Sequence, residues 1–274
     1  MNGMPVIARI RTNNQEEQGF YQIDVTEEGG EISTVDVHED VLVHEGLHKG
    51  MMLSREKLEQ LRREAQGIRA YHAGLRYLSY RIRSVHEMRD YLNRKHFSDQ
   101  QITFAIEHLK EEKLLDDRQY ALSFAKTRIR TSTKGPQMIY RELLQAGINQ
   151  ELAAETEDLF PAKEQLEHAR KYLHKQKASV KNKKSYIESR QVLSRLLMQR
   201  GYSRKITEQV VNEINDFLIE NERNALQHQA EKAMQKFRKF SGKEFNLKVR
   251  TFLYKKGFPV DAITSYLREQ TGDR

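Results

Sequence analysis

The sequence predicts a mainly α-helical protein in which tandem three-helix repeats form an elongated, curved body behind a small antiparallel β N-terminal extension. Three observations predict it. Four similar ten-residue segments recur along the chain, only about the first 40 residues alternate apolar and polar side chains, and residues that break helices are scarce. The 274 residues include 14 Gly and 4 Pro, while 38% are hydrophobic and 31% are charged, which favours a thin-cored helical chain over one compact globule.

The charge is distributed unevenly along the chain, although the net charge is +8. Residues 1–50 hold three Lys or Arg against ten Asp or Glu, so the remaining residues carry an excess of 15 positive charges. A helical body with this excess is expected to attract a polyanion, and nucleic acid comes first. A charged surface that is merely solvated is the alternative.

Composition also excludes several classes of protein. The chain has no cysteine, which rules out disulfides and thiolate metal sites. No run of about 18 apolar residues occurs, and the N-terminus lacks the layout of a signal peptide, so we expect a soluble, cytoplasmic protein without a membrane partner. Because no phosphate loop or nucleophile elbow is present either, we expect no catalytic residues and no cofactor.

Residues 1–53 are expected to form a small, acidic, β-rich segment. Alternation of apolar and polar residues, many of them β-branched, predicts strands at 5–11, 20–26 and 31–37. One or two helical turns are expected after the third strand, ending at Gly46 or Gly50.

This region contains the pattern H-E-x-x-H of a zinc protease, at His44, Glu45 and His48. The pattern binds zinc when both histidines lie on one face of a helix and a third ligand follows. Here Gly46 lies inside the motif, and Met51 and Ser54 occupy the positions where the longer signature has Gly and His. We therefore expect ordinary histidines and no metal site.

From Ser54 onward the pattern is helical almost without pause. Ser54 is a suitable N-cap, and apolar residues at spacings of three, four or seven predict a long helix, interrupted only by Gly67 and Gly74. We place a connecting helix at 54–69, followed by three-helix repeats at 70–115, 116–160, 161–219 and 220–274.

The repeats are recognised from the segments MRDYLNRKHF, IYRELLQAGI, LSRLLMQRGY and VRTFLYKKGF, which begin at residues 88, 139, 193 and 249. Each has an apolar first residue, leucine at the fifth position and an apolar or aromatic residue at the end. Glycine precedes that last residue in three copies, with His96 in the first, and supplies the left-handed residue that ends a helix. Each copy is therefore expected to be the second helix of its repeat, and chance similarity among leucine-rich helices is the alternative.

Three stretches of the sequence resemble the RecX family of bacterial regulatory proteins. They are LRYLSYRIRSVHEMRDYL at 75–92, LLDDRQYALSFAKTR at 114–128 and KGPQMIYRELLQAGI at 134–148. The resemblance is specific over about residues 70–160 and extends more weakly to the end of the chain. An acidic, strand-rich extension and a fourth repeat resemble the longer members from Gram-positive bacteria, while His96 and Lys113 depart from the usual pattern.

The resemblance implies a regulatory protein without catalytic activity whose partner is the RecA recombinase filament on single-stranded DNA. Family members suppress ATP hydrolysis and strand exchange by the recombinase, either in the groove of the filament or at its growing end. Some of them also bind DNA, so single-stranded DNA and duplex DNA are further expected partners.

The densest basic stretch runs from Arg170 to Lys205, with twelve Lys or Arg and one acid, Glu188. Its portion 177–184 has no strong apolar period and is expected to be a loop whose lysines meet phosphates. We predict that DNA or an acidic face of the filament contacts Lys181, Lys183, Lys184 and Arg190. A solvated loop is the alternative.

A second basic group precedes Pro136 in the second repeat, and it consists of Arg128, Arg130 and Lys134. The neighbouring carboxylates of Asp116 and Asp117 do not face each other on a helix, so we interpret them as capping groups and not as a catalytic pair.

Two interpretations of function remain after these expectations. The favoured one is regulation of the RecA filament, and the second is a helical-repeat protein that acts on nucleic acid without RecA. Because no heptad seam or broad apolar stripe is evident, we expect a monomer.

Overall fold

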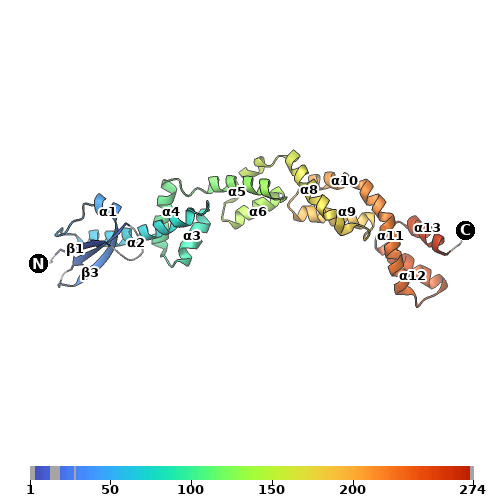
Figure 1. Cartoon of the computed structure of the whole chain (residues 1–274), viewed down its shortest axis with the longest axis horizontal. Helices are drawn as coiled ribbons and strands as arrows, with labels where there is room; N and C mark the ends of the chain where they lie inside the picture. The colour runs from blue at the N-terminus through green and yellow to red at the C-terminus, as the bar shows by residue number, and fades with distance from the viewer. Residues whose placement is uncertain (1–3, 13–18, 28, 272–274) are drawn as a thin grey trace. The chain divides into compact units, whose positions relative to one another are not determined.

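The structure is a computed structural model that describes residues 4–12, 19–27 and 29–271 (Figure 1). By its packing the chain divides into two units, residues 1–120 with 146–148, and residues 121–145 with 149–274. No helix in the described part of the chain is long and apolar enough to cross a membrane. The predicted fold class is confirmed, with mostly helical structure after a small antiparallel sheet, while the elongated and curved shape of the body stays a prediction.

The sheet has three strands, β1 (Val6–Thr12), β2 (Phe20–Thr26) and β3 (Ile32–His38), in the order β1-β2-β3. Both pairings are antiparallel, and each strand lies within one residue of its predicted bounds. Alternate residues of the strands point to one face, where apolar side chains such as Ile23 and Val35 are buried against Leu61 and its neighbours.

Helix α1 (Glu39–His44) follows β3 and ends at the first histidine of the H-E-x-x-H pattern. His44 and His48 therefore do not share a helix face, as a zinc protease would require. Glu45, which would have to activate a zinc-bound water, forms an ion pair with Lys57 at 2.5 Å. Among the described residues no group of three potential ligands is placed to hold a metal ion.

Helix α2 (Arg55–Leu78) begins at Ser54, whose side chain accepts a hydrogen bond from the Lys57 amide at 3.1 Å. It runs without a break through both glycines, which we expected to interrupt it. A Cβ atom on Gly67 would lie 2.6 Å from the Phe104 ring, and one on Gly74 would lie 2.9 Å from Leu109. The glycines thus let helix α4 approach α2 closely, and one continuous helix serves both the sheet and the first repeat.

The remaining helices group into threes, as the fold class predicts. The first repeat adds α3 (Val85–Arg94) and α4 (Asp99–Glu111) to the end of α2. The second comprises α5 (Asp117–Thr131), α6 (Pro136–Gln145) and α7 (Gln150–Glu155), which continues into the 3-10 turn η1 (Thr156–Leu159). The third comprises α8 (Ala162–Val180), α9 (Tyr186–Gln199) and α10 (Arg204–Asn212), and the fourth α11 (Asn215–Phe237), α12 (Gly242–Lys255) and α13 (Val260–Thr271).

The four ten-residue segments are the second helices of these groups, α3, α6, α9 and α12. Their shared leucines are completely buried: Leu92, Leu143, Leu197 and Leu253. The residue before each final apolar side chain has a positive φ, between 63° and 96°, in the order His96, Gly147, Gly201 and Gly257. Left-handed backbone at this place ends the helix and turns the chain toward the next one, so the predicted helix stop is confirmed.

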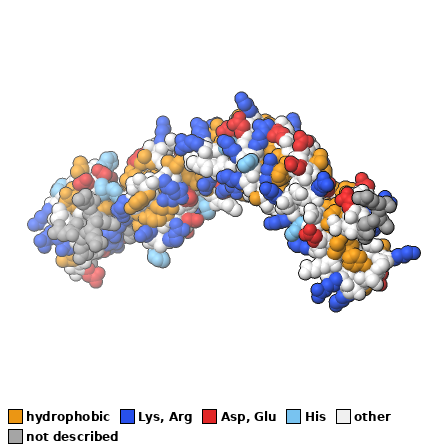
Figure 2. All heavy atoms as spheres, turned by 45° about the vertical axis from the view of Figure 1, so that its right-hand side comes forward, with side chains coloured by type: hydrophobic (Ala, Val, Ile, Leu, Met, Phe, Trp, Pro, Cys, Tyr) orange, Lys and Arg blue, Asp and Glu red, His pale blue; other side chains and the backbone are white. Residues whose placement is uncertain are grey.

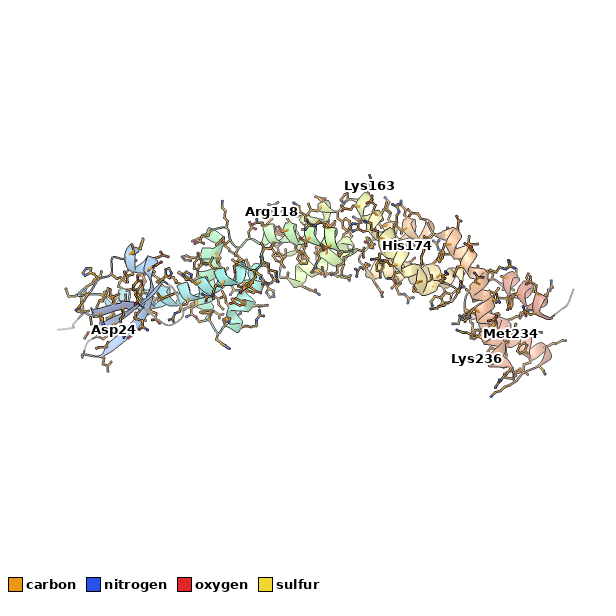
Figure 3. The ribbon with its side chains drawn as sticks, in the orientation of Figure 1. Asp24, Arg118, Lys163, His174, Met234 and Lys236 are labelled. Carbon is orange, nitrogen blue, oxygen red and sulfur yellow. The ribbon has the colours of Figure 1, made fainter. Side chains whose placement is uncertain are left out.

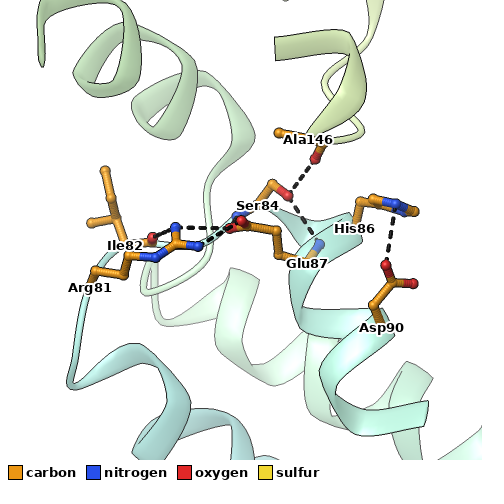
Figure 4. A network of polar contacts seen from close by, with 7 residues as sticks. All are labelled: Arg81, Ile82, Ser84, His86, Glu87, Asp90 and Ala146. Carbon is orange, nitrogen blue, oxygen red and sulfur yellow. Dashed lines mark hydrogen bonds and ion pairs between the residues drawn. The ribbon is translucent and has the colours of Figure 1, made fainter. Parts of the chain in front are cut away.

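Each glycine turn also contacts the start of an earlier second helix. The Ser84 hydroxyl, at the start of α3, donates to the Ala146 carbonyl at 2.6 Å (Figure 4). The Gly135 amide, before α6, donates to the Arg200 carbonyl at 2.8 Å, and the Ser185 hydroxyl, before α9, donates to the Lys256 carbonyl at 2.7 Å. In every case the acceptor immediately precedes the glycine. A helix end with unpaired carbonyls thus meets a helix start with unpaired donors.

This close contact explains where glycine is needed and where it is not. A Cβ atom on Gly147 would lie 2.2 Å from His86 Cβ, and one on Gly201 would lie 2.5 Å from the Met138 amide nitrogen. His96 is exposed and belongs to the first repeat, which no earlier repeat precedes. Its left-handed φ of 63° carries only the modest backbone cost of a non-glycine residue there.

The two neighbouring aspartates have different partners. Asp116 Oδ1 accepts from the amides of Arg118 and Gln119, at 2.8 and 3.0 Å, which confirms a cap on α5. Asp117 Oδ1 accepts instead from the Val85 amide at 2.8 Å, so it caps helix α3. Burial raises the pKa of the Asp117 carboxyl above its ordinary value. The sequence could not reveal this role, because the two residues are far apart along the chain.

The glycine contact predicts that Gly201→Ala destabilises the protein more than Gly242→Ala. Both glycines have a positive φ, but only Gly201 faces a neighbouring backbone, whereas a Cβ atom on Gly242 would meet nothing within 4 Å. We expect a cost of about 1 kcal/mol for the backbone at Gly242, and about 1 to 3 kcal/mol more at Gly201 for the forced shift. Urea unfolding checks this, and equal midpoints for the two variants would contradict the contact.

The serine contacts predict a similar contrast between Ser185→Ala and Ser241→Ala. Ser185 is fully buried and both caps α9 and donates to the Lys256 carbonyl, whereas Ser241, at the start of α12, is exposed and makes no side-chain cap bond. Removing Ser185 Oγ should cost about 1 to 3 kcal/mol because the Lys256 carbonyl loses its donor and α9 loses its cap. Removing Ser241 Oγ should change the unfolding midpoint little, and a loss as large as that for Ser185 would disprove the distinction.

Candidate nucleic-acid or filament interface

The basic stretch from Arg170 to Lys205 lies on α8, α9, α10 and the turns between them. Helix α8 continues to Val180, so the expected loop at 177–184 is wrong for its first half. The reason is that the Val180 side chain is completely buried in the core of the third repeat and holds the last turn of the helix in place. The turn that carries lysines is limited to residues 181–185.

Two buried side chains of α11 hold this turn. Asn221 Oδ1 accepts from the Asn182 amide at 2.6 Å, and Asn221 Nδ2 donates to the Val180 carbonyl at 3.3 Å. Gln229 Nε2 donates to the Lys183 carbonyl at 2.8 Å. Asn182 itself has a φ of 55°, a left-handed conformation that Asn tolerates better than most residues. These hydrogen bonds fix the backbone of the turn.

Of the four residues predicted in this stretch, two have exposed side chains and two are held by other residues of the protein. Lys181 and Lys183 are exposed, and the described structure gives their amino groups no partner. Lys184 forms an ion pair with Glu188, the single acid of the stretch. Lys181 and Lys183 are thus the lysines of the turn whose charge is available to a polyanion.

Arg190 is held by the protein itself. Its Nη1 donates to Asn215 Oδ1 at 2.6 Å and its Nη2 donates to Asn212 Oδ1 at 2.7 Å. The guanidinium also lies 5.6 Å from the centre of the Tyr186 ring. Arg190 therefore joins α9 to the connection between α10 and α11, and it has little freedom to reach a phosphate.

Several further cations of the stretch are likewise engaged. Arg170 pairs with Glu213 at 2.7 Å and lowers the pKa of that carboxyl, while Arg204 pairs with Glu208 at 2.6 Å. Arg200 donates to the Thr133 carbonyl at 3.3 Å. Exposed cations with no partner in the described structure, which the sequence prediction did not single out, are Lys171, Lys175, Arg195 and Lys205.

The spacing of two of these residues in the sequence already indicates a shared basic helix face. Lys171 and Lys175 are four apart and therefore share a face of α8. Lys163, at the start of the same helix, is exposed too and points away from the ribbon in Figure 3. Lys and Arg side chains are spread over the face drawn in Figure 2 and do not gather in one patch. A polyanion would thus meet separate cations on helix faces in addition to the turn.

Two of the three cations in the second predicted group share one carboxylate. Arg128 Nε lies 3.0 Å from Glu142 Oε2, and Lys134 forms an ion pair with the other oxygen of Glu142. The Arg128 guanidinium also lies 4.7 Å from the centre of the Phe124 ring. Arg130 alone of the three is exposed and has no partner in the described structure. This group therefore offers less positive charge than its sequence indicates.

Comparison with known proteins places the chain in a family. It is 34% identical over 97% of its length to the whole of "Regulatory protein RecX" of Halalkalibacterium halodurans. It is 32% identical over 98% of its length to the whole protein of that name from Oceanobacillus iheyensis. The chain belongs to the RecX family. It is thus related over nearly its full length to proteins named as regulators, and the resemblance found in the sequence is confirmed.

Three family models and a solved structure also match the chain. The models of the first, second and third RecX three-helix domains match residues 70–109, 116–156 and 220–267. The third model thus matches the group formed by α11, α12 and α13. A crystal structure of regulatory protein RecX is 26% identical, covers 76% of this chain and 100% of its own, and superposes with a TM-score of 0.66.

The pairing pattern predicts that the double variant Lys181→Glu, Lys183→Glu weakens binding to single-stranded DNA. Two reversed charges should reduce the salt dependence of log K by about 0.7 for each lost phosphate contact. Fluorescence anisotropy across a salt series measures both quantities. The control is Lys239→Glu, Lys243→Glu, which changes the same charge on exposed residues near the start of α12. Equal effects of the two double variants would rule out a specific role for the turn.

Arg190→Ala should behave differently, because its hydrogen bonds are internal. We expect a loss of about 1 to 3 kcal/mol in unfolding free energy, since Asn212 and Asn215 lose a charged donor. Affinity for single-stranded DNA should stay within about twofold of the parent protein at a temperature where both are folded. A large loss of affinity without a change in stability would instead restore Arg190 to the interface.

Proposed function

We propose that this chain binds the RecA filament on single-stranded DNA and inhibits ATP hydrolysis and strand exchange by the recombinase. It would act in the cytoplasm by binding alone, without catalysis, metal or cofactor. The observation that carries the proposal is similarity over 97% of the chain to a complete regulatory protein RecX. The family name connects that similarity to RecA.

The unpaired cations support a surface that meets a polyanion. The turn at Lys181 and Lys183 has a fixed backbone, so binding there costs little backbone entropy. Lys181 and Lys183 are exposed, and their long side chains can reach phosphates of the bound strand or carboxylates of the recombinase. Both kinds of anion occur on a nucleoprotein filament.

Binding to nucleic acid without RecA is the second candidate. It is favoured by the same exposed lysines, because phosphate contacts need no particular protein partner. In this case the protein would reduce recombinase activity only by occupying the DNA, and excess DNA would relieve the effect. The two candidates therefore differ in their response to added single-stranded DNA.

The test is the rate of ATP hydrolysis by RecA on single-stranded DNA, with this protein added below one copy per recombinase subunit. Filament control predicts a strong fall at low ratio that persists when free single-stranded DNA is added after filament assembly. Relief by the added DNA would favour the second candidate. An unchanged rate near saturation would contradict the proposed function.

A further inference from the structure

The first unit contains a hollow that the proposed function does not use. Its volume is about 1010 Å³, and it lies between α1, α2 and α4. The apolar side chains along it include Leu42, Ile68 and Phe104, each of which is only partly buried. Val43, also in the lining, is 76% exposed. Covering an apolar surface of this kind removes it from water, which favours binding of a partner.

The charged residues of the hollow are of one sign. Its carboxylates lie on α1 and α2 or directly after α1 and α4, and they are Glu39, Asp40, Glu45, Glu64 and Glu112. No Lys or Arg among the described residues lines it, although the chain as a whole carries a net charge of +8. Glu45 is the carboxylate paired with Lys57, and the others face the hollow without an Arg or Lys ion pair in the described structure. An anion such as DNA would therefore be repelled here, and a cation attracted.

The walls extend over two helical turns. Phe104 and His108 on α4 and Glu112, its C-cap, are spaced by four, so these lining residues follow one helix face for about 12 Å. On α2 Glu64 and Ile68 have the same spacing. The Tyr71 hydroxyl donates to Glu112 at 2.7 Å, and burial together with this bond raises the pKa of Tyr71 to about 12. Each wall thus carries an apolar side chain and a carboxylate within about two helical turns of each other, Ile68 with Glu64 and Phe104 with Glu112.

We propose that this hollow, the acidic groove, binds a cationic amphipathic helix of a partner protein. Apolar side chains at spacings of three and four would cover Ile68 and Phe104, while Lys or Arg beside them would pair with Glu64 and Glu112. A small polyamine would satisfy the carboxylates but leave the apolar wall in water. The inference does not depend on RecA, because the groove and the lysine turn lie in different units of the chain.

The test uses the full-length protein and two labelled 14-residue helical peptides, one of Leu and Lys and one of Leu and Glu in the same pattern. The Leu–Lys peptide should bind and the Leu–Glu peptide should not. Val43→Lys should lower the affinity for the Leu–Lys peptide about tenfold, because it adds a cation at the rim of the groove without disturbing the core. The control is Ile219→Lys on α11, which makes the same change at a residue that is 61% exposed.

A second variant tests the carboxylates directly. The double variant Glu64→Gln, Glu112→Gln keeps the size of both side chains and should also lower the affinity for the Leu–Lys peptide about tenfold. Glu151→Gln with Glu157→Gln, both exposed in the second repeat, should leave its affinity unchanged. Equal loss in groove and control variants, no binding of either peptide, or full displacement by spermidine would each overturn the proposal. Dimerisation of the protein that Val43→Lys abolishes would overturn it too, by assigning the groove to a second copy.

Discussion

The glycine turn at the end of a second helix meets two demands at once. It ends its own helix through a left-handed residue, and it places the preceding carbonyl against the start of an earlier second helix. The negative end of one helix thus meets the positive start of another, with almost no space between the backbones at Gly135 and Gly201. Since a side chain at Gly201 would collide with Met138, the residue that stops the helix also permits its repeat to pack on the preceding one.

Much of the fold follows from local patterns. Alternation of apolar and polar residues predicted the three strands to within one residue, and the recurring segments around Leu92, Leu143, Leu197 and Leu253 predicted the second helices. Both patterns arise because one face of a strand or helix is buried, which sets a period of about two residues in a strand and about 3.6 in a helix. Contacts between distant residues could not be inferred in this way. Gly67 and Gly74 were expected to interrupt α2, yet they are the places where α4 packs against it, and Asp117 caps a helix that begins 32 residues earlier.

The pairing of the basic residues could not be predicted, because a sequence shows how many charges there are but not which of them form ion pairs. Lys181 and Lys183 are exposed as expected, whereas Lys184 is neutralised by Glu188 and Arg190 is held by Asn212 and Asn215. Glu142 similarly forms ion pairs with both Arg128 and Lys134. Positive charge in this chain therefore stabilises helix junctions as well as supplying a surface for anions, and family membership, more than charge, points to the recombinase.

The central claim is that this RecX family member recognises a filament and not merely its DNA. The most direct measurement is its affinity for a labelled single strand, bare and coated with RecA and a nonhydrolysable ATP analogue, by anisotropy at one salt concentration. The account predicts binding to the coated strand that is tighter by at least about tenfold, or 1.4 kcal/mol. Equal or weaker binding to the coated strand would contradict it and leave a nucleic-acid-binding protein.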